Sequence, residues 1–182
     1  MTLETERLIL RHFVEADADH LYTFACDPEV GTPCGWPAHR SVDETVWVIN
    51  NVFTSDECYA ICLKEDNRAI GVIELKRPGR SDLAKGDDEG ELGFWLGKPF
   101  WGRGIMPEAA NEVLRHAFTD LKLKRVWAGH AVYNDKSRRV QEKCGFVYQY
   151  TVKAHRCDLT GEVRDECANL LTRESWLERN DV

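Results

Sequence analysis

The chain has 182 residues, enough for one domain with a full hydrophobic core and few for two. Its composition, 43% hydrophobic and 30% charged, is typical of a folded domain in water, and no apolar run approaches the roughly 20 residues of a membrane span. The opening MTLETERLIL lacks the layout of a signal peptide, so we expect a cytoplasmic protein with no membrane partner. A formal net charge of −7 argues against nucleic acid as the main partner.

Seven cysteines are scattered along the chain without a Cys-x-x-Cys pair. An odd number of widely spaced cysteines favours reduced thiols in a reducing compartment. The same scatter predicts that the chain has no metal site.

The first elements combine a strand with two helices. Residues 6–11, ERLILR, are typical of a strand, and residues 15–26 place alanine, leucine and tyrosine on one helical face. Ser41 and Glu44 form the Ser-x-x-Glu pattern of a capping box. An apolar stripe that ends at Phe53 follows it, so a second helix is predicted there.

The rest of the chain continues this mixture of strands and helices. Strand patterns cover 58–64, 69–76, 91–97, 124–132, 146–157 and 162–172, and helical patterns cover 107–118 and 137–144. A polar, glycine-containing loop is predicted over 77–90. These elements predict one α/β domain over residues 1–182, with a mixed central sheet of about six to seven strands flanked by helices.

Two glycines, Gly102 and Gly104, stand between a predicted strand and a predicted helix. A dinucleotide-binding fingerprint requires a third glycine where this chain has Pro107, and a phosphate-binding P-loop requires a Gly-Lys pair followed by Ser or Thr. Both motifs are therefore excluded. One interpretation makes the glycines turn residues, with Pro107 in the first helical turn. The other makes the loop an anion site.

The order of neighbours favours the anion site. The free amides of Arg103, Gly104, Ile105 and Met106 cluster at a helix start, where the helix dipole favours a diphosphate. The Arg103 side chain adds a cation beside the same site.

Four stretches of the chain, taken in order, resemble the GNAT superfamily of acetyl-coenzyme A-dependent N-acetyltransferases. TERLILR is similar to the opening strand of the family, GELGFWLGKPFWGRGIMPEAA to its central strand and pyrophosphate loop, and NDKSRRVQEKCGF to its later coenzyme-binding helix. ANLLTRESWL resembles the end of the ribosomal-protein alanine N-acetyltransferase branch. The family loop, Gln/Arg-x-x-Gly-x-Gly/Ala, is matched at Gly104, whereas Trp101 and Met106 depart from it.

The resemblance implies acetyl-coenzyme A as the co-substrate, bound by the central strand, the glycine loop and the later helix. The implied contacts are Phe94, Trp95, Leu96, Gly102, Arg103, Gly104, Ile105, Met106, Asn134 and Ser137. Arg138 and Arg139 are further candidates for the phosphate at the 3′ end of the coenzyme. Asn134 suits a helix cap equally well.

The resemblance also implies that a primary amine attacks the acetyl thioester directly. The amine must first lose a proton, because a lysine-type ammonium has a pKa near roughly 10. Glu91, at the start of the central strand, is the candidate catalytic base, with Glu74 and His39 as weaker candidates. The alternative makes Glu91 a charge on the surface of the strand.

The leaving thiolate requires a hydrogen-bond donor or an acid. Many family members place a tyrosine where this chain has Gln141, which cannot act as an acid. Ser137 is the nearest hydroxyl and the candidate catalytic donor, although its position also suits a bond to the helix backbone. Tyr133 is the other candidate hydroxyl. A backbone N–H near residues 94–96 is the candidate oxyanion donor, and Cys144, without an adjacent histidine, is expected to be buried.

The sequence does not determine the identity of the acceptor amine. Thr32–Ser41, TPCGWPAHRS, lies where the family builds the acceptor wall. A protein N-terminus, a polyamine, an aminoglycoside and a small metabolite amine all suit the chain, and a homodimer is compatible with it. Two other classes remain: a non-catalytic acyl-coenzyme A sensor or structural module, and an α/β domain with a different nucleotide cofactor.

Overall fold

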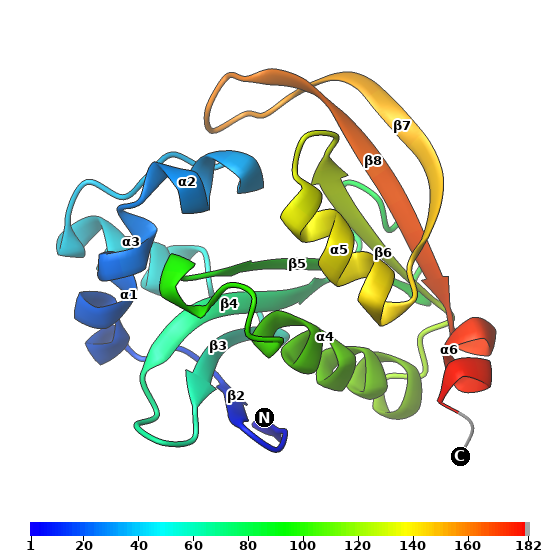
Figure 1. Cartoon of the computed structure of the whole chain (residues 1–182), viewed down its shortest axis with the longest axis horizontal. Coiled ribbons are helices and arrows are strands. Elements are labelled where there is room, and N and C mark those ends of the chain that lie inside the picture. Colours follow the sequence, from blue (N-terminus) through cyan, green and yellow to red (C-terminus); the bar gives the residue numbers. More distant parts are fainter. Residues whose placement is uncertain (181–182) are drawn as a thin grey trace.

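An eight-stranded sheet in the order β1-β2-β3-β4-β5-β6-β8-β7 forms the centre of the computed structural model, which describes residues 1–180 (Figure 1). The strands are β1 (Leu3–Glu4), β2 (Leu8–Arg11), β3 (Cys58–Leu63), β4 (Ala69–Lys76), β5 (Glu89–Leu96), β6 (Arg125–Ala131), β7 (Val147–Arg156) and β8 (Val163–Thr172). The helices are α1 (Ala18–Ala25), α2 (Pro28–Gly31), α3 (Val42–Asn51), α4 (Ile105–Arg115), α5 (Asp135–Cys144) and α6 (Arg173–Arg179), with short helical turns η1 (Glu15–Asp17), η2 (Thr32–Cys34), η3 (Lys98–Phe100) and η4 (His116–Asp120). Residues 181–182, the end of the predicted domain, lie outside the described residues.

The predicted α/β class and mixed sheet are confirmed, and each predicted strand has a counterpart in the structure. The sheet has eight strands rather than about six to seven, because Leu3 and Glu4 pair with Leu10 and Ile9. A strand of two residues is too short to show a period in the sequence. The short helices α2 and α6 are likewise additions to the predicted elements.

The predicted capping box at the start of α3 is half formed. Ser41 Oγ accepts the N–H of Glu44 at 3.1 Å, as a helix cap does. The Glu44 carboxylate accepts the N–H of Arg40 at 2.6 Å, where a capping box would use the N–H of Ser41.

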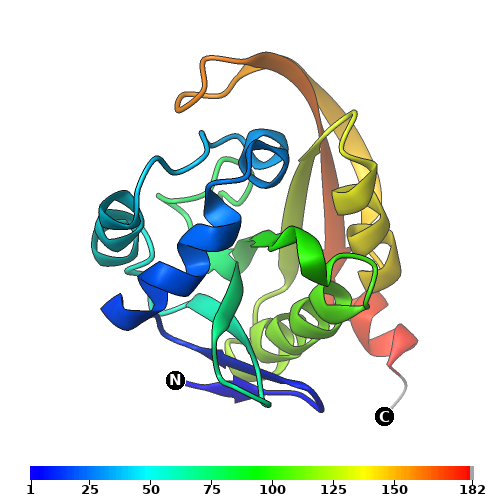
Figure 2. The ribbon, with the colours of Figure 1, turned by 60° about the vertical axis from the view of Figure 1, so that its left-hand side comes forward.

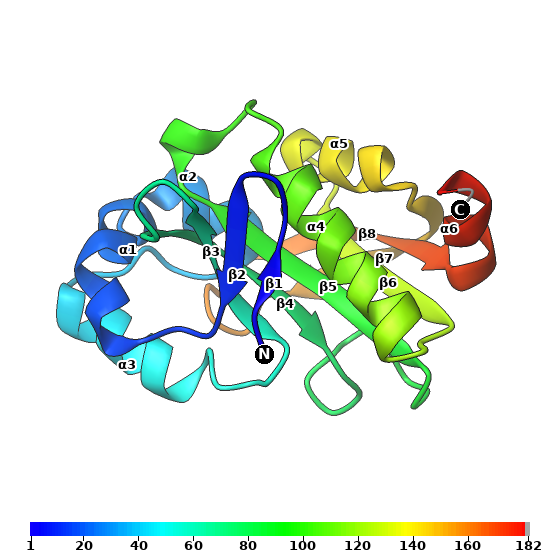
Figure 3. The same cartoon turned by 90° about the horizontal axis from the view of Figure 1, so that it is seen from below.

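Side chains of the central strands alternate between two separate cores. Ile73 and Leu92 belong to the core on which α4 lies, and Val72 and Trp95 belong to the core under α1 and α3. Figure 3 shows α4 crossing one face of the sheet, and Figure 2 shows α1 and α4 at different sides of the strands. The central strands are thus covered on both faces.

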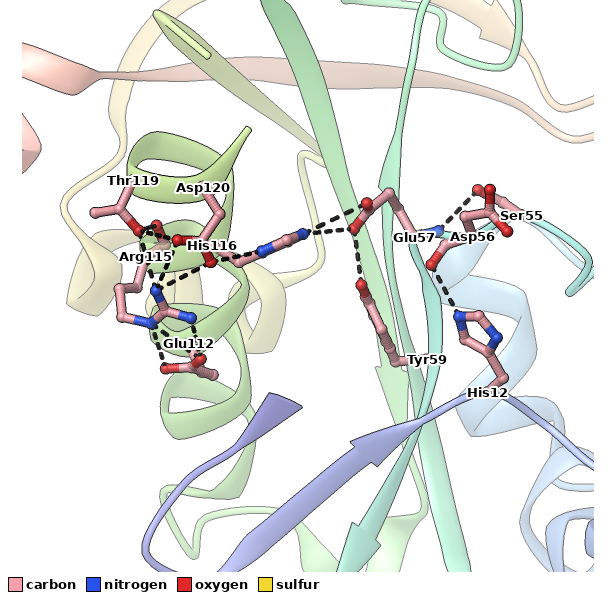
Figure 4. Close-up of polar contacts among 10 residues, drawn as sticks. All are labelled: His12, Ser55, Asp56, Glu57, Tyr59, Glu112, Arg115, His116, Thr119 and Asp120. Carbon is pink, nitrogen blue, oxygen red and sulfur yellow. Dashed lines mark hydrogen bonds and ion pairs between the residues drawn. The ribbon is translucent and has the colours of Figure 1, made fainter. Parts of the chain in front are cut away.

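A buried polar network fixes the far end of α4 against the sheet (Figure 4). His116, fully buried in the π-helical turn η4, has Nδ1 2.9 Å from Asp120 Oδ2 and Nε2 3.2 Å from Glu57 Oε2. The Glu57 carboxylate also accepts the Tyr59 hydroxyl at 2.8 Å. These contacts join the C-terminal end of α4 to the residue just before β3.

In the described sheet, β5 and β6 are parallel and all other neighbouring strands are antiparallel. The long β7–β8 hairpin closes this end of the sheet and its tip returns toward α2 (Figure 1). Arg164 of the hairpin donates to the Thr32 carbonyl at 3.1 Å. Between residues 1 and 180, no helix is both long enough and apolar enough to span a bilayer.

Candidate active site

The strands β5 and β6 separate part-way along their length. They pair from Glu89↔Arg125 to Glu91↔Trp127, after which β5 continues beside β4 and β6 beside β8. The facing edges of the two strands are then open to other partners. The wedge is the opening between β5 and β6 beyond their last paired residues. Two cavities adjoin the wedge, and both are lined by Pro33, Cys34, Phe94, Asn134 and Ser137.

The first cavity, named the glycine-loop cavity, has a volume of 440 Å³ and lies between β5, the loop before α4, and α5. Every predicted coenzyme contact lines it except Arg103 and the phosphate candidate Arg138. Three cations of α5, Lys136, Arg139 and Lys143, also line it, against two carboxylates. Together with the positive end of α4, this wall suits an anionic ligand.

The glycine loop presents free amides to this cavity. Gly102 and Gly104 both have a φ of +74°, a conformation that glycine adopts without a steric penalty. Gly104 is the N-cap residue of α4, and no side chain caps it. Throughout the described chain, the N–H groups of Gly104, Ile105 and Met106 have no protein acceptor. These amides at the start of an 11-residue helix form a site for phosphate oxygens.

Arg7, just before β2, holds the glycine loop in place. Its Nη1 donates to the Arg103 carbonyl at 3.1 Å, and its Nε donates to Glu108 Oε2 at 2.6 Å. Partial burial alone would raise the pKa of Glu108, but hydrogen bonds from Thr5 and Arg7 lower that pKa below its ordinary value. The Arg103 guanidinium itself lies 5.8 Å from the centre of the Phe100 ring.

The second cavity, named the hairpin cavity, has a volume of 360 Å³ and lies between β5, the loop before it, and the β7–β8 hairpin. Glu91 lines this cavity. Its Oε2 accepts the Ser81 hydroxyl at 2.6 Å and the amides of Asp82 and Leu83 at 3.1 and 3.3 Å. Its Oε1 lies 3.8 Å from Lys76 Nζ. One carboxylate oxygen therefore orders the loop, and the other lies within ion-pair distance of Lys76 in a side chain that lines the cavity.

The β7–β8 hairpin supplies the opposite wall of the hairpin cavity. His155, Cys157, Arg164 and Glu166 all line it. Arg164 Nη2 lies 2.7 Å from Glu166 Oε1, so part of the charge on this wall is already paired. The resulting wall is polar and of mixed charge, in contrast with the apolar β5 side chains of the glycine-loop cavity.

The chain is similar to known proteins along most of its length. Residues 7–147 match the family described as "Acetyltransferase (GNAT) domain". The chain belongs to the GNAT family of acetyltransferases. The predicted membership of this family, and with it the prediction of an N-acetyltransferase, are confirmed.

Individual GNAT proteins agree with this assignment. The crystal structure of a GNAT-family acetyltransferase from Bacillus anthracis superposes with a TM-score of 0.84 at 23% identity, covering 96% of this chain and 99% of that one. An uncharacterized N-acetyltransferase of Bacillus licheniformis, p20, is 29% identical over 150 residues, 80% of this chain and 82% of the relative. The ribosomal-protein-serine acetyltransferase of Escherichia coli is 26% identical over 156 residues, 82% of this chain and 84% of the relative.

Asn134 and Ser137 lie at the start of α5, where the two cavities of this GNAT fold meet. Asn134 Oδ1 accepts the N–H of Ser137 at 3.2 Å, so the helix-cap role considered as an alternative is present. Asn134 Nδ2 donates to the Pro33 carbonyl at 3.4 Å. The contact of Asn134 with the coenzyme stays a prediction, and it is compatible with capping.

Ser137 is the hydroxyl that remains available at this junction. The hydroxyl of Tyr133, the other candidate, donates to Glu162 at 2.9 Å and lies 3.3 Å from Arg164 Nη1. Burial and the bond to Glu162 raise the pKa of Tyr133. Its hydrogen is thus committed to the hairpin, whereas Ser137 lines both cavities.

The two arginines predicted near the coenzyme phosphate differ in their surroundings. Arg139 lines the glycine-loop cavity. Arg138 forms ion pairs with Asp135 and Glu142 at 2.9 and 2.6 Å. Of the two, Arg139 is the one placed to meet an anion in this cavity.

Neither cavity is lined by Glu74, His39 or Cys144, the three other candidates from the sequence. Glu74 is buried with Oε1 3.2 Å from Arg80 Nη2, and burial raises the pKa of Glu74. His39 Nδ1 lies 2.8 Å from Thr45 Oγ1, and partial burial lowers the pKa of His39. Cys144 is buried, as expected, and burial raises the pKa of its thiol to about 11.

Several site residues have no signal in the sequence. In the sequence, Arg7 belongs only to a strand pattern. His155, Cys157 and Glu166 belong only to a predicted closing hairpin. In the 32–41 loop, expected to form the acceptor wall, Pro33, Cys34 and Gly35 line the hairpin cavity.

Proposed function

We propose that this GNAT protein transfers the acetyl group of acetyl-coenzyme A directly to a primary amine, either a protein N-terminus or a small molecule. The observation that carries the proposal is the meeting of two cavities at Phe94, Asn134 and Ser137 in the wedge. One cavity suits an anionic coenzyme and the other a polar acceptor. Bound acetyl-coenzyme A would supply a thioester, an acetyl donor that amines attack.

The glycine-loop cavity fits the coenzyme in three respects. The free amides of Gly104, Ile105 and Met106 suit a diphosphate at the positive end of α4. Arg139 and neighbouring lysines of α5 add positive charge. The open edge of β5 offers backbone groups to the amides of the pantetheine arm, as a strand does to an added strand.

Glu91 is the proposed base in the hairpin cavity. Its Oε1, directly or through a water molecule, takes a proton from the acceptor ammonium, and the free amine then attacks. A nitrogen–carbon bond forms and the carbon–sulfur bond breaks, while a wedge-facing N–H of β5 stabilises charge on the carbonyl oxygen. Ser137 Oγ donates its hydrogen to the sulfur. The nitrogen loses two protons in becoming an amide: Glu91 takes the first and passes it to solvent, and the second replaces the hydrogen that Ser137 gives to the sulfur, so the reaction needs no other reagent.

The cytoplasm is the proposed site of this reaction. All seven cysteines are free thiols, which suits a reducing compartment. The ribosomal-protein-serine acetyltransferase among the relatives makes a protein N-terminus a natural first acceptor to test.

A binding measurement followed by an acceptor screen tests the proposal. Calorimetry with acetyl-coenzyme A is expected to give a 1:1 complex. Release of coenzyme A is then measured with peptides that begin with alanine or serine, with spermidine, with an aminoglycoside and with small primary amines. Acceptor-dependent release supports the proposal. Tight binding without release on any acceptor favours an acyl-coenzyme A sensor, and no binding favours a different nucleotide cofactor.

A further inference from the structure

Gln141, in the middle of α5, uses its whole side-chain amide in hydrogen bonds. Its Nε2 donates to the Gly129 carbonyl at 3.0 Å and to Ser137 Oγ at 3.1 Å. Its Oε1 accepts from Asn169 Nδ2 at 2.7 Å. Gln141 and Asn169 are only 2% and 7% exposed, so the protein and not the solvent decides how these amides are oriented.

The directions of these bonds follow from one fixed group. The Gly129 carbonyl can only accept, so Gln141 must turn Nε2 toward it. Gln141 Oε1 then faces Asn169, which must present Nδ2. The second hydrogen of Gln141 Nε2 is left for Ser137 Oγ, which therefore acts as the acceptor in that bond.

The hydroxyl hydrogen of Ser137 consequently points away from Gln141. Over residues 1–180, no protein acceptor takes this hydrogen, while Oγ already accepts from Gln141. Ser137 lines both the glycine-loop cavity and the hairpin cavity. The hydrogen is therefore available to a ligand atom at their junction.

We infer that Asn169 and Gln141 are positioning residues that keep the hydroxyl hydrogen of Ser137 aimed at the sulfur of the coenzyme. The inference rests on the proposed acetyl transfer, in which the sulfur leaves as a thiol. Ser137 and Gln141 are four residues apart on one face of α5, and Asn169 lies on β8. The packing of α5 on the sheet thus sets the direction of one hydroxyl.

A purely structural role predicts a different result. Gln141 also ties α5 to β6 and β8, and that role alone would change stability without any effect specific to sulfur. Desulfo-coenzyme A lacks the sulfur atom. The ratio of its Kd to the Kd of coenzyme A therefore measures how much contacts with the sulfur contribute to binding. The ratio is measured without turnover and without an acceptor.

Calorimetry with both ligands at the same pH provides the test. The parent is expected to bind coenzyme A about 3- to 10-fold more tightly than desulfo-coenzyme A, the size of one hydrogen bond. Ser137→Ala should reduce this ratio toward one. Gln141→Met, which has a similar length and no donor, and Asn169→Asp should do the same. Asn169→Asp places a carboxylate against Gln141 Oε1. The charged acceptor outcompetes the neutral Gly129 carbonyl for Gln141 Nε2, so the amide turns and its oxygen takes the Ser137 hydrogen.

The control and the outcomes separate the two roles. Thr172→Val removes the cap of α6, away from both cavities, and should leave the ratio unchanged. If the ratio falls toward one in Ser137→Ala but keeps the parent value in Gln141→Met and Asn169→Asp, the positioning role is overturned and Ser137 remains the donor. A ratio near one in the parent overturns both roles. If neither ligand binds the parent, the proposed coenzyme site itself is rejected. Asn169→Asp carries the test alone if Gln141→Met fails to fold.

Discussion

Asn134 Oδ1 accepts the N–H of Ser137, the third residue of α5, at 3.2 Å, at the point where the two cavities meet. The residue that starts the helix therefore also borders the proposed coenzyme. Stability and binding are coupled at this residue, and substitutions can separate them.

Asn134→Ala should lower the free energy of unfolding by about 1 kcal/mol through loss of the cap. It should also weaken coenzyme binding by about 0.5–1.5 kcal/mol, the net value of one hydrogen bond. Asn134→Asp is the matched variant, because its carboxylate still caps the helix but the amide donor is gone. Urea unfolding and calorimetry measure the two effects. Unchanged coenzyme affinity in both variants would leave Asn134 with capping alone.

Glu91→Gln should lower the rate of acetyl transfer by about 10²–10⁴-fold at neutral pH, because it keeps the shape of the side chain without its basicity. Coenzyme affinity should not change, since Glu91 lines the hairpin cavity alone. The defect should shrink as pH rises and free amine becomes abundant. Glu89→Gln, on the same strand but outside both cavities, is the control. A near-normal rate across pH would leave Glu91 with its loop-ordering contact to Ser81.

Glu108 should make stability depend on pH. Because its pKa is lowered in the folded protein, its contribution is present above the ordinary glutamate value of 4.5 and is lost as pH falls toward the folded pKa. Glu108→Gln should cost roughly 1–2 kcal/mol at pH 7 and should flatten the loss of stability in acid. Urea unfolding of both proteins from pH 7 to pH 3.5 measures this. Parallel pH profiles for the parent and the variant would exclude the contribution.

The glycine loop was predictable because its information is local. A strand, two glycines and a helix follow one another within residues 91–118, and hydrophobic periods reveal both elements. The amides of Gly104 and Ile105 must then lie at a helix start. The same reasoning predicted Asn134 and Ser137 at the start of the next helix.

The rest of the site depends on contacts between distant residues, which local patterns do not contain. Arg7 contacts the carbonyl of Arg103 across 96 positions of sequence. The hairpin cavity exists because β8 inserts between β6 and β7, which brings His155 to the cavity that Glu91 lines. The donors that occupy Glu91 Oε2 come from the fold of a loop that the sequence shows only as polar. The eighth strand was missed for a related reason, because two residues carry no period.

The most direct test of the coenzyme site is calorimetric titration of acetyl-coenzyme A into Gly104→Val. Valine at a φ of +74° is strained, and its branched side chain would crowd the free amides at the start of α4. Gly79→Val is the control, because Gly79 also has a positive φ, has open space around it, and lines neither cavity. We expect acetyl-coenzyme A to bind Gly104→Val at least 10-fold more weakly than the parent, and Gly79→Val as tightly as the parent. A folded Gly104→Val protein with the affinity of the parent would contradict the assignment of the glycine loop.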